Sequence, residues 1–188
     1  MKKIIFISFS ILFLTAKATS QITKGNWLVG GNASFSSEKQ EVPNYSTIVK
    51  YTTYSVTPNI GYFLVDKVAA GLSLGTGYTK TKDGNTFSSV TSYGFGPFAR
   101  YYFLEKENQI NLFVNANYAY NINKINNSGT KGTMTSYNYS FSGGPVVYFN
   151  SSVGLEFTIG WYHYKSIDDK SFTNSIRLGL GFQIHLEK

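Results

Sequence analysis

The chain has 188 residues and a formal net charge of +7, with 14% charged and 17% aromatic residues. An ordinary soluble domain carries about 25% charged residues, so the composition argues against a typical cytosolic enzyme. The sequence contains no cysteine, which excludes disulfide scaffolds, thiol catalysis and cysteine-based zinc sites.

The N-terminal segment has the pattern of a secretory signal peptide. After a basic start, residues 4–14 are apolar apart from two serines, a run that is too short to span a bilayer as a helix. Small residues suit cleavage after Ala18 or after Ser20. We therefore predict a signal peptide over residues 1–20 and a single mature domain over residues 21–188.

Removal of the signal peptide also lowers the charge. Without Lys2, Lys3 and Lys17, the 17 basic residues fall to 14, against 10 acidic ones. This excess is weak and scattered, so nucleic-acid binding is not predicted. No apolar run of helical membrane-spanning length follows the signal segment.

Hydropathy in the mature chain alternates with a period of two. Over residues 110–123 the even positions are mainly apolar and the odd positions mainly Asn, and similar alternation marks residues 68–75, 153–162 and 176–186. This period is typical of strands with one apolar face. Extended along the chain, the pattern predicts eight strands, at about 25–36, 50–63, 67–81, 87–103, 110–123, 134–149, 153–165 and 172–187.

The predicted connections alternate in length. Short turns are expected near 64–66, 104–109 and 150–152, and longer polar loops near 37–49, 82–86, 124–133 and 166–171. An even number of strands with short turns at one end and longer loops at the other is typical of outer-membrane barrels. The predicted fold class is therefore all-β, an eight-stranded antiparallel up-and-down transmembrane β-barrel.

The polar strand faces carry Gly, Ser, Thr and Asn with few charges. Such faces suit a barrel interior better than a solvated exterior, which favours a membrane barrel over a soluble lipocalin-like barrel that binds a ligand inside. Aromatics at strand ends suggest interfacial belts. We expect one belt to include Tyr62, Phe63, Tyr101, Tyr102, Phe103, Tyr148 and Phe149, and the other Tyr51, Tyr78, Phe87, Tyr137, Trp161 and Tyr164. Because proline removes a ladder donor, bulges or bends are expected at Pro58, Pro97 and Pro145.

A weak internal repeat supports a plan of consecutive hairpins. Thr57-Pro58 precedes Tyr62-Phe63-Leu64, and Gly96-Pro97 precedes Tyr102-Phe103-Leu104 in the same way. With its alternation and apolar last strand, the mature chain resembles the small outer-membrane β-barrel family, including OmpA- and OmpX-like eight-stranded barrels. The resemblance implies a plugged lumen, an outer-membrane location with periplasmic termini, and folding by periplasmic chaperones and the barrel-assembly machinery. Family members commonly end on an aromatic residue, whereas this chain ends Leu186-Glu187-Lys188.

Few charges fall on the inward positions of the predicted strands. Arg100 and Glu156 lie at similar distances from the short-turn ends of their strands, and Arg177 lies higher. Because unpaired charges in a tight interior are costly, we predict a structural charge network in the lumen, with an Arg100–Glu156 bridge and Arg177 as a second partner.

Enzymatic motifs are weak. Residues 71–75 match G-x-S-x-G but lie within a strand, whereas a nucleophile elbow needs a turn between strand and helix. A lipid A-modifying enzyme would need an arrangement such as His163 with Ser166 and Asp168. No catalytic, cofactor or metal site is predicted, because two histidines without a close third ligand make no metal site.

The sequence thus favours a monomeric barrel with a structural, surface-recognition or adhesion role. Outer-membrane lipid and lipopolysaccharide are the expected surroundings, and an extracellular ligand would bind the loops. A lipid A-modifying enzyme, a narrow channel and a soluble lipocalin-like barrel remain alternatives.

Overall fold

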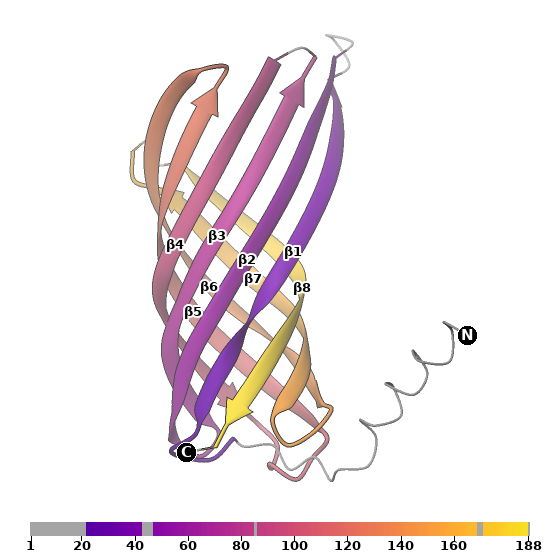
Figure 1. Ribbon diagram of the computed structural model, residues 1–188, viewed down its shortest axis with the longest axis vertical. Helices are drawn as coiled ribbons and strands as arrows, with labels where there is room; N and C mark the ends of the chain where they lie inside the picture. The colour runs from indigo at the N-terminus through magenta and orange to yellow at the C-terminus, as the bar shows by residue number, and fades with distance from the viewer. Residues whose placement is uncertain (1–21, 43–46, 85, 169–170, 188) are drawn as a thin grey trace, which may run out of the picture.

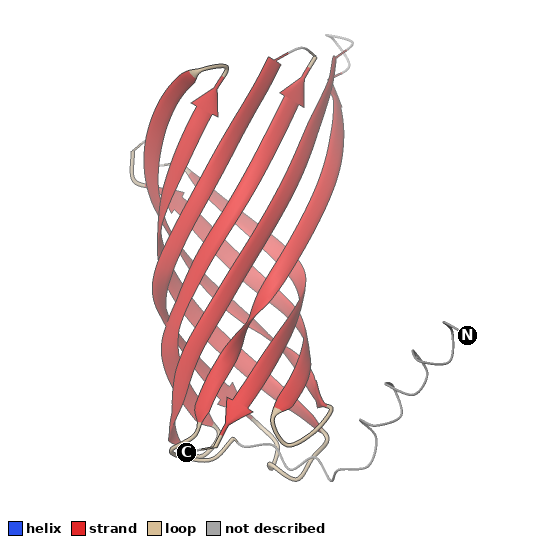
Figure 2. Ribbon diagram, in the orientation of Figure 1, coloured by secondary structure: helices blue, strands red, loops and turns tan. Residues whose placement is uncertain are grey.

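The computed structural model describes residues 22–42, 47–84, 86–168 and 171–187. Eight strands follow one another around a closed antiparallel barrel, and loops are confined to its two ends (Figure 2). The strands are β1 (Trp27–Val42), β2 (Thr47–Val65), β3 (Val68–Asp83), β4 (Thr86–Tyr102), β5 (Ile110–Asn127), β6 (Thr130–Tyr148), β7 (Val153–Ser166) and β8 (Phe172–Leu186). The predicted eight-stranded up-and-down barrel is therefore confirmed. The predicted signal peptide, residues 1–20, lies outside the described residues.

The two ends of the barrel differ. β1 begins and β8 ends at the same end, which we call the base; the opposite end is the rim (Figure 1). At the base, β2 and β3 are joined by the two residues Asp66 and Lys67, and the other two connections cover residues 103–109 and 149–152. Within the described ranges, no helix is long and apolar enough to cross a bilayer.

The strands extend further toward the rim than the sequence predicted. β5 and β6 stay paired up to Asn127 and Thr130, so most of the loop predicted at 124–133 is strand. Ser128 and Gly129 form the turn, with φ angles of 49° and 98°, as a type I′ hairpin requires. The loop predicted at 37–49 is likewise mostly strand, because β1 reaches Val42 and β2 starts at Thr47. These segments are polar on both faces, so the hydropathy alternation disappears while the strand pairing continues. Both faces of a hairpin can carry polar side chains where neither face lies in an apolar environment.

The apolar face of the barrel points outward. Large apolar side chains on alternate positions are exposed around the outside, among them Leu72 (58% exposed), Phe95 (57%), Phe157 (46%) and Leu180 (54%). The intervening inward positions carry mainly Gly, Ser, Thr and Asn. This is the arrangement of a membrane barrel and the reverse of a lipocalin-like barrel, which buries its apolar face.

Part of the predicted aromatic belt lies inside the barrel. Phe63, Tyr102 and Tyr148 are fully buried, whereas their neighbours Tyr62, Tyr101 and Phe149 lie on the outer surface or at its edge. The belt prediction was wrong for these three residues because consecutive strand residues point to opposite faces. Tyr164 also faces inward, where its hydroxyl accepts a hydrogen bond from Asn123.

Each proline interrupts the pairing of its strand with one neighbouring strand and leaves the register unchanged. Pairing between β2 and β3 stops after Val56 and resumes at Asn59 with the same register, on either side of Pro58. The same two-residue interruption surrounds Pro97 and Pro145. No bulge occurs at these prolines, because the register is the same on both sides of each interruption.

The seam that closes the barrel covers only its lower part. β1 pairs with β8 over Trp27–Asn32 and Gly181–Leu186, whereas β1 pairs with β2 up to Val42 and β8 with β7 up to Phe172. Figure 1 shows the two strands adjacent near the base and diverging toward the rim. Among the described residues, the rim-side halves of β1 and β8 therefore have one unpaired edge each.

Candidate functional site

The base of the lumen is filled by aromatic side chains from five strands. His185 on β8 lies within 5.5–5.8 Å, centroid to centroid, of the rings of Phe63, Tyr102 and Tyr148. Phe113 of β5 packs on Tyr102 from the other side. All five side chains are at most 1% exposed. We call these residues the base cluster, and it leaves little room for water at this level.

Arg100 and Glu156 lie directly above the base cluster. Arg100 Nη1 is 2.5 Å from Glu156 Oε1, with side-chain exposures of 6% and 0%. The second carboxylate oxygen of Glu156 accepts a hydrogen bond from Gln183 Nε2 at 3.3 Å. Arg100 also donates to Tyr102 Oη at 3.2 Å and to Asn115 Oδ1 at 3.4 Å. The carboxylate is thereby enclosed by donors from β4 and β8.

Further packing holds the guanidinium of Arg100 in place. Its central carbon lies 4.4 Å from the ring centroid of Phe113. A cation over an aromatic face gains about 0.5–2 kcal/mol depending on desolvation. The Arg100 guanidinium is therefore held by the Phe113 ring below it, by the hydrogen bond to Asn115 and by the ion pair with Glu156.

Arg177 does not join this pair. It is opposite Gly160, whereas Glu156 is opposite Gly181 on the same strand, β8. Four residues along a strand separate the two levels by about 13 Å. Arg177 instead donates from Nε to Ser175 Oγ at 3.1 Å, and its guanidinium lies 5.0 Å from the ring centroid of Tyr162. No carboxylate among the described residues is within ion-pair distance of it.

A polar cavity occupies the lumen above Arg100. Its volume is about 770 Å³, and its walls are mainly inward-facing Ser, Thr and Asn side chains from β1 to β7, with Arg177 of β8 and Glu38 of β1 nearer the rim. Side-chain hydrogen bonds cross between strands, for example from Asn121 to Asn138 and between Ser34 and Ser55. This volume is in the range of small-molecule sites, which is about 300–1,000 Å³. Three further lining residues, Phe35, Thr76 and Leu178, occupy outward strand positions.

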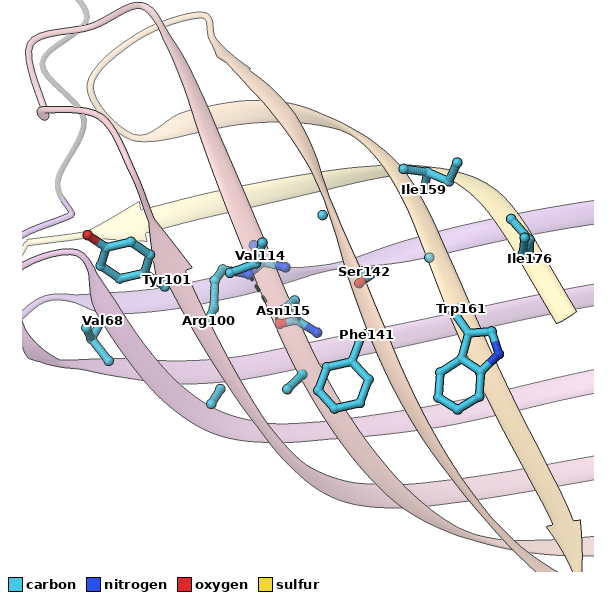
Figure 3. A pocket seen from close by; sticks show the side chains of 14 residues that line it. Val68, Arg100, Tyr101, Val114, Asn115, Phe141, Ser142, Ile159, Trp161 and Ile176 are labelled. Atoms are coloured by element: carbon cyan, nitrogen blue, oxygen red, sulfur yellow. Dashed lines mark hydrogen bonds between the residues drawn. The ribbon is translucent and has the colours of Figure 1, made fainter. Parts of the chain in front are cut away.

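A second hollow lies on the outer surface. It holds about 700 Å³ and is lined mainly by apolar side chains that Figure 3 shows coming from several strands, with Tyr101, Phe141 and Trp161 prominent among them. The small residues Ala99 and Gly143 also line it, while bulkier neighbours stand around them. Since this face is apolar, hydrocarbon chains would fill the hollow in a bilayer.

The residues considered for an enzymatic site are not assembled. His163 Nδ1 is 2.7 Å from Asn174 Oδ1, and its ring stacks on Tyr139. Asp168 Oδ2 accepts a hydrogen bond from the backbone N–H of Thr135. Neither contact builds a relay to a nucleophile. Within the described residues, no group of three His, Asp or Glu side chains is close enough to hold a metal ion.

Sequence reasoning missed the base cluster. Its signal was present, because Phe63, Tyr102 and Tyr148 each stand next to an outward aromatic in a strand of known parity. The belt prediction placed both aromatic residues of each pair on the outer surface. The partial seam had no such signal, since β1 and β8 are far apart in the sequence.

Comparison with known proteins supports the fold. No family model and no curated protein matches the chain. Among solved structures, the crystal structure of Neisserial surface protein A (NspA) is similar, with a TM-score of 0.55, 16% sequence identity, and coverage of 86% of this chain and 97% of that one. The N-terminal β-barrel domain of Pseudomonas aeruginosa OprF aligns with a TM-score of 0.46, 18% identity, and coverage of 87% and 98%. The chain therefore has the fold of a small eight-stranded outer-membrane barrel, as its resemblance to that family led us to expect.

Proposed function

We propose that the protein is an integral outer-membrane barrel with periplasmic termini and a structural or surface-recognition role. The observation that carries this proposal is the outward apolar face around a closed barrel. The strands are 14 to 19 residues long, whereas a strand needs about 9–11 residues to span a bilayer. The excess extends the rim hairpins beyond the membrane.

Charge on the outer surface near the rim supports this orientation. Lysines occupy outward positions beyond the apolar zone on several strands, and we call them the lysine collar: Lys50, Lys80, Lys82, Lys124 and Lys131. Three of them lie near rings, as Lys124 does at 5.6 Å from the centroid of Tyr93. Such a collar suits the anionic groups of lipopolysaccharide, so the rim faces outward and the hairpins offer the recognition surface.

The base cluster is the reason that we propose a closed lumen. Its rings and the Arg100–Glu156 pair fill the base-side end of the lumen. An ion crossing there would have to displace packed rings or a buried ion pair. We therefore expect no conductance from the purified protein in planar bilayers, and stable single-channel currents would refute a closed lumen.

Location and orientation can be tested in cells. The protein should occur in the outer-membrane fraction and migrate differently on SDS gels with and without boiling. An epitope inserted after Gly129, at the β5–β6 turn, should bind antibody on intact cells. The same epitope after Asp66, in the base turn, is the matched control and should need permeabilised cells. Reversed accessibility would refute the orientation, and a soluble protein would refute membrane insertion.

A further inference from the structure

The opening between β1 and β8 lies within the apolar zone of the barrel. On β8 the outward positions from Leu186 to Ile176 are all exposed and apolar, a stretch as long as a membrane-spanning strand. Pairing with β1 covers only the part from Leu186 to Gly181. The rim-side half of the zone is thus open sideways, and Leu178 and Ile176 beside it are 82% and 74% exposed.

The opening connects the polar cavity with the outer surface. Most residues around the cavity point inward, but Phe35 on β1, Thr76 on β3 and Leu178 on β8 are outward residues and line it as well. Phe35 and Leu178 stand on the two strand edges that are unpaired above the seam. Inward residues of β1 near this edge, Asn32, Ser34 and Ser36, are exposed too. A molecule can therefore lie partly in the cavity and partly against the apolar exterior.

The chemistry of the edges restricts what occupies the opening. Unpaired strand edges present N–H and C=O groups, and each such group costs several kcal/mol in hydrocarbon without a partner. A plain alkyl chain leaves these groups unsatisfied, so the occupant must bring polar atoms. The flanking side chains Phe35 and Leu178 favour an apolar part in the same molecule. Together these requirements describe an amphiphile.

Charge in the cavity selects among amphiphiles. Arg177 lies on β8, one of the two open-edged strands, and its exposed guanidinium has no ion-pair partner among the described residues. Arg100 is neutralised by Glu156. Glu38 is the acidic residue of the wall, and it lies six residues beyond the end of the seam on β1, nearer the rim. A guanidinium that has no ion-pair partner and lies beside hydroxyl and amide groups suits a phosphate or carboxylate headgroup.

We propose that the cavity and the opening together bind an anionic membrane amphiphile. Its headgroup lies in the cavity on Arg177, and its acyl chain leaves between β1 and β8, beside Phe35 and Leu178, into the outer leaflet. This site rests on the proposed membrane insertion and adds a ligand class to it. It differs from the lysine collar, which lies on the outer surface.

The test uses the mature protein in dodecyl maltoside micelles, with folding verified by the mobility shift on unboiled gels. The probe is lysophosphatidic acid with a dibromostearoyl chain, and the neutral control is the monoacylglycerol with the same chain. Trp161 pairs with Ile176 of β8 and reports quenching by bromine. Trp27 lies at the base, beside Leu186, and is replaced by Phe so that one reporter remains.

Quenching by the anionic probe should saturate as its mole fraction in the micelle rises. Half-saturation should require about tenfold less of the anionic probe than of the neutral probe, because only the anionic headgroup forms charge-assisted hydrogen bonds with Arg177. Arg177→Gln should abolish that difference, and Arg177→Lys should retain most of it. Lys106→Gln removes an exposed positive charge in the base connection, at the opposite end of the barrel from the lysine collar, and should behave as the parent protein.

Three results would overturn the proposal. Quenching that rises linearly with both probes means partition without a site. An equal effect of Lys106→Gln and Arg177→Gln means general charge attraction. A concentration-dependent dimer in sedimentation, with no saturable quenching, means that the edges pair with a second copy. These measurements use the folded protein in micelles and test the amphiphile site alone. Membrane location is tested separately by cell fractionation, so failure of one proposal can be distinguished from failure of the other.

Discussion

Replacing Glu156 by Gln isolates the energetic role of the buried ion pair. Glu156 is fully buried, and the substitution keeps its shape and an acceptor oxygen but removes the charge that balances Arg100. Leaving one member of a buried pair uncompensated costs about 3–5 kcal/mol. Arg100 keeps its hydrogen bonds to Tyr102 and Asn115 and borders the polar cavity. We therefore expect a loss at the lower end, about 3 kcal/mol, or roughly a hundredfold in the folding constant.

The assay is urea unfolding of the refolded barrel in lipid vesicles, followed by tryptophan fluorescence and analysed by linear extrapolation. The matched control is Glu105→Gln in the base turn region. Glu105 Oε1 is also 2.5 Å from its partner, Lys67 Nζ, but the Glu105 side chain is 70% exposed. Exposed pairs are weakened by water and salt, so this variant should remain close to the parent protein in stability.

The same ion pair permits a second check. Replacing both members by apolar residues, Arg100→Met with Glu156→Leu, should recover most of the lost stability, because no charge is left buried without a partner. Equal losses from Glu156→Gln and Glu105→Gln would refute the reasoning, since the two pairs share a distance and differ in burial. A fully stable Glu156→Gln protein would show that water in the cavity screens Arg100.

Two more substitutions test the packing of the barrel. Gly96→Ala should destabilise by about 1–3 kcal/mol, because its Cβ would clash with the backbone carbonyl oxygen of Tyr118. Gly132→Ala, with nothing within 4 Å of the added carbon, should be nearly neutral in the same urea titration. Asn111→Ala should cost about 1–3 kcal/mol, because the buried amide of Asn111 accepts from the Leu104 N–H and donates to the Leu104 carbonyl. Unchanged unfolding midpoints for Gly96→Ala or Asn111→Ala would contradict these close contacts.

Much of the barrel was predictable because the face of the sheet on which a strand side chain lies is a local property. The alternation at 110–123 and 176–186 assigned an outward face to Leu112, Val114 and Leu178 without any tertiary information, and the structure exposes all three. The ends of the alternating segments also located the base connections to within a few residues. The rim hairpins were less predictable, since hydropathy does not distinguish a polar loop from a polar strand pair such as Asn126 with Lys131.

Contacts across the lumen required the tertiary structure. Arg100 and Glu156 have similar distances to the base and are brought together, but Arg177 lies about four residues higher because strand pairing sets its level opposite Gly160. The packing of His185 with rings from three other strands depends on which inward residues meet across the barrel. The short seam between β1 and β8 depends on how the first and last strands meet on closure. The sequence by itself thus determined strand number and facing, which follow from local side-chain geometry; closure decided the lumen contacts and the lateral opening, because they join strands from opposite ends of the chain.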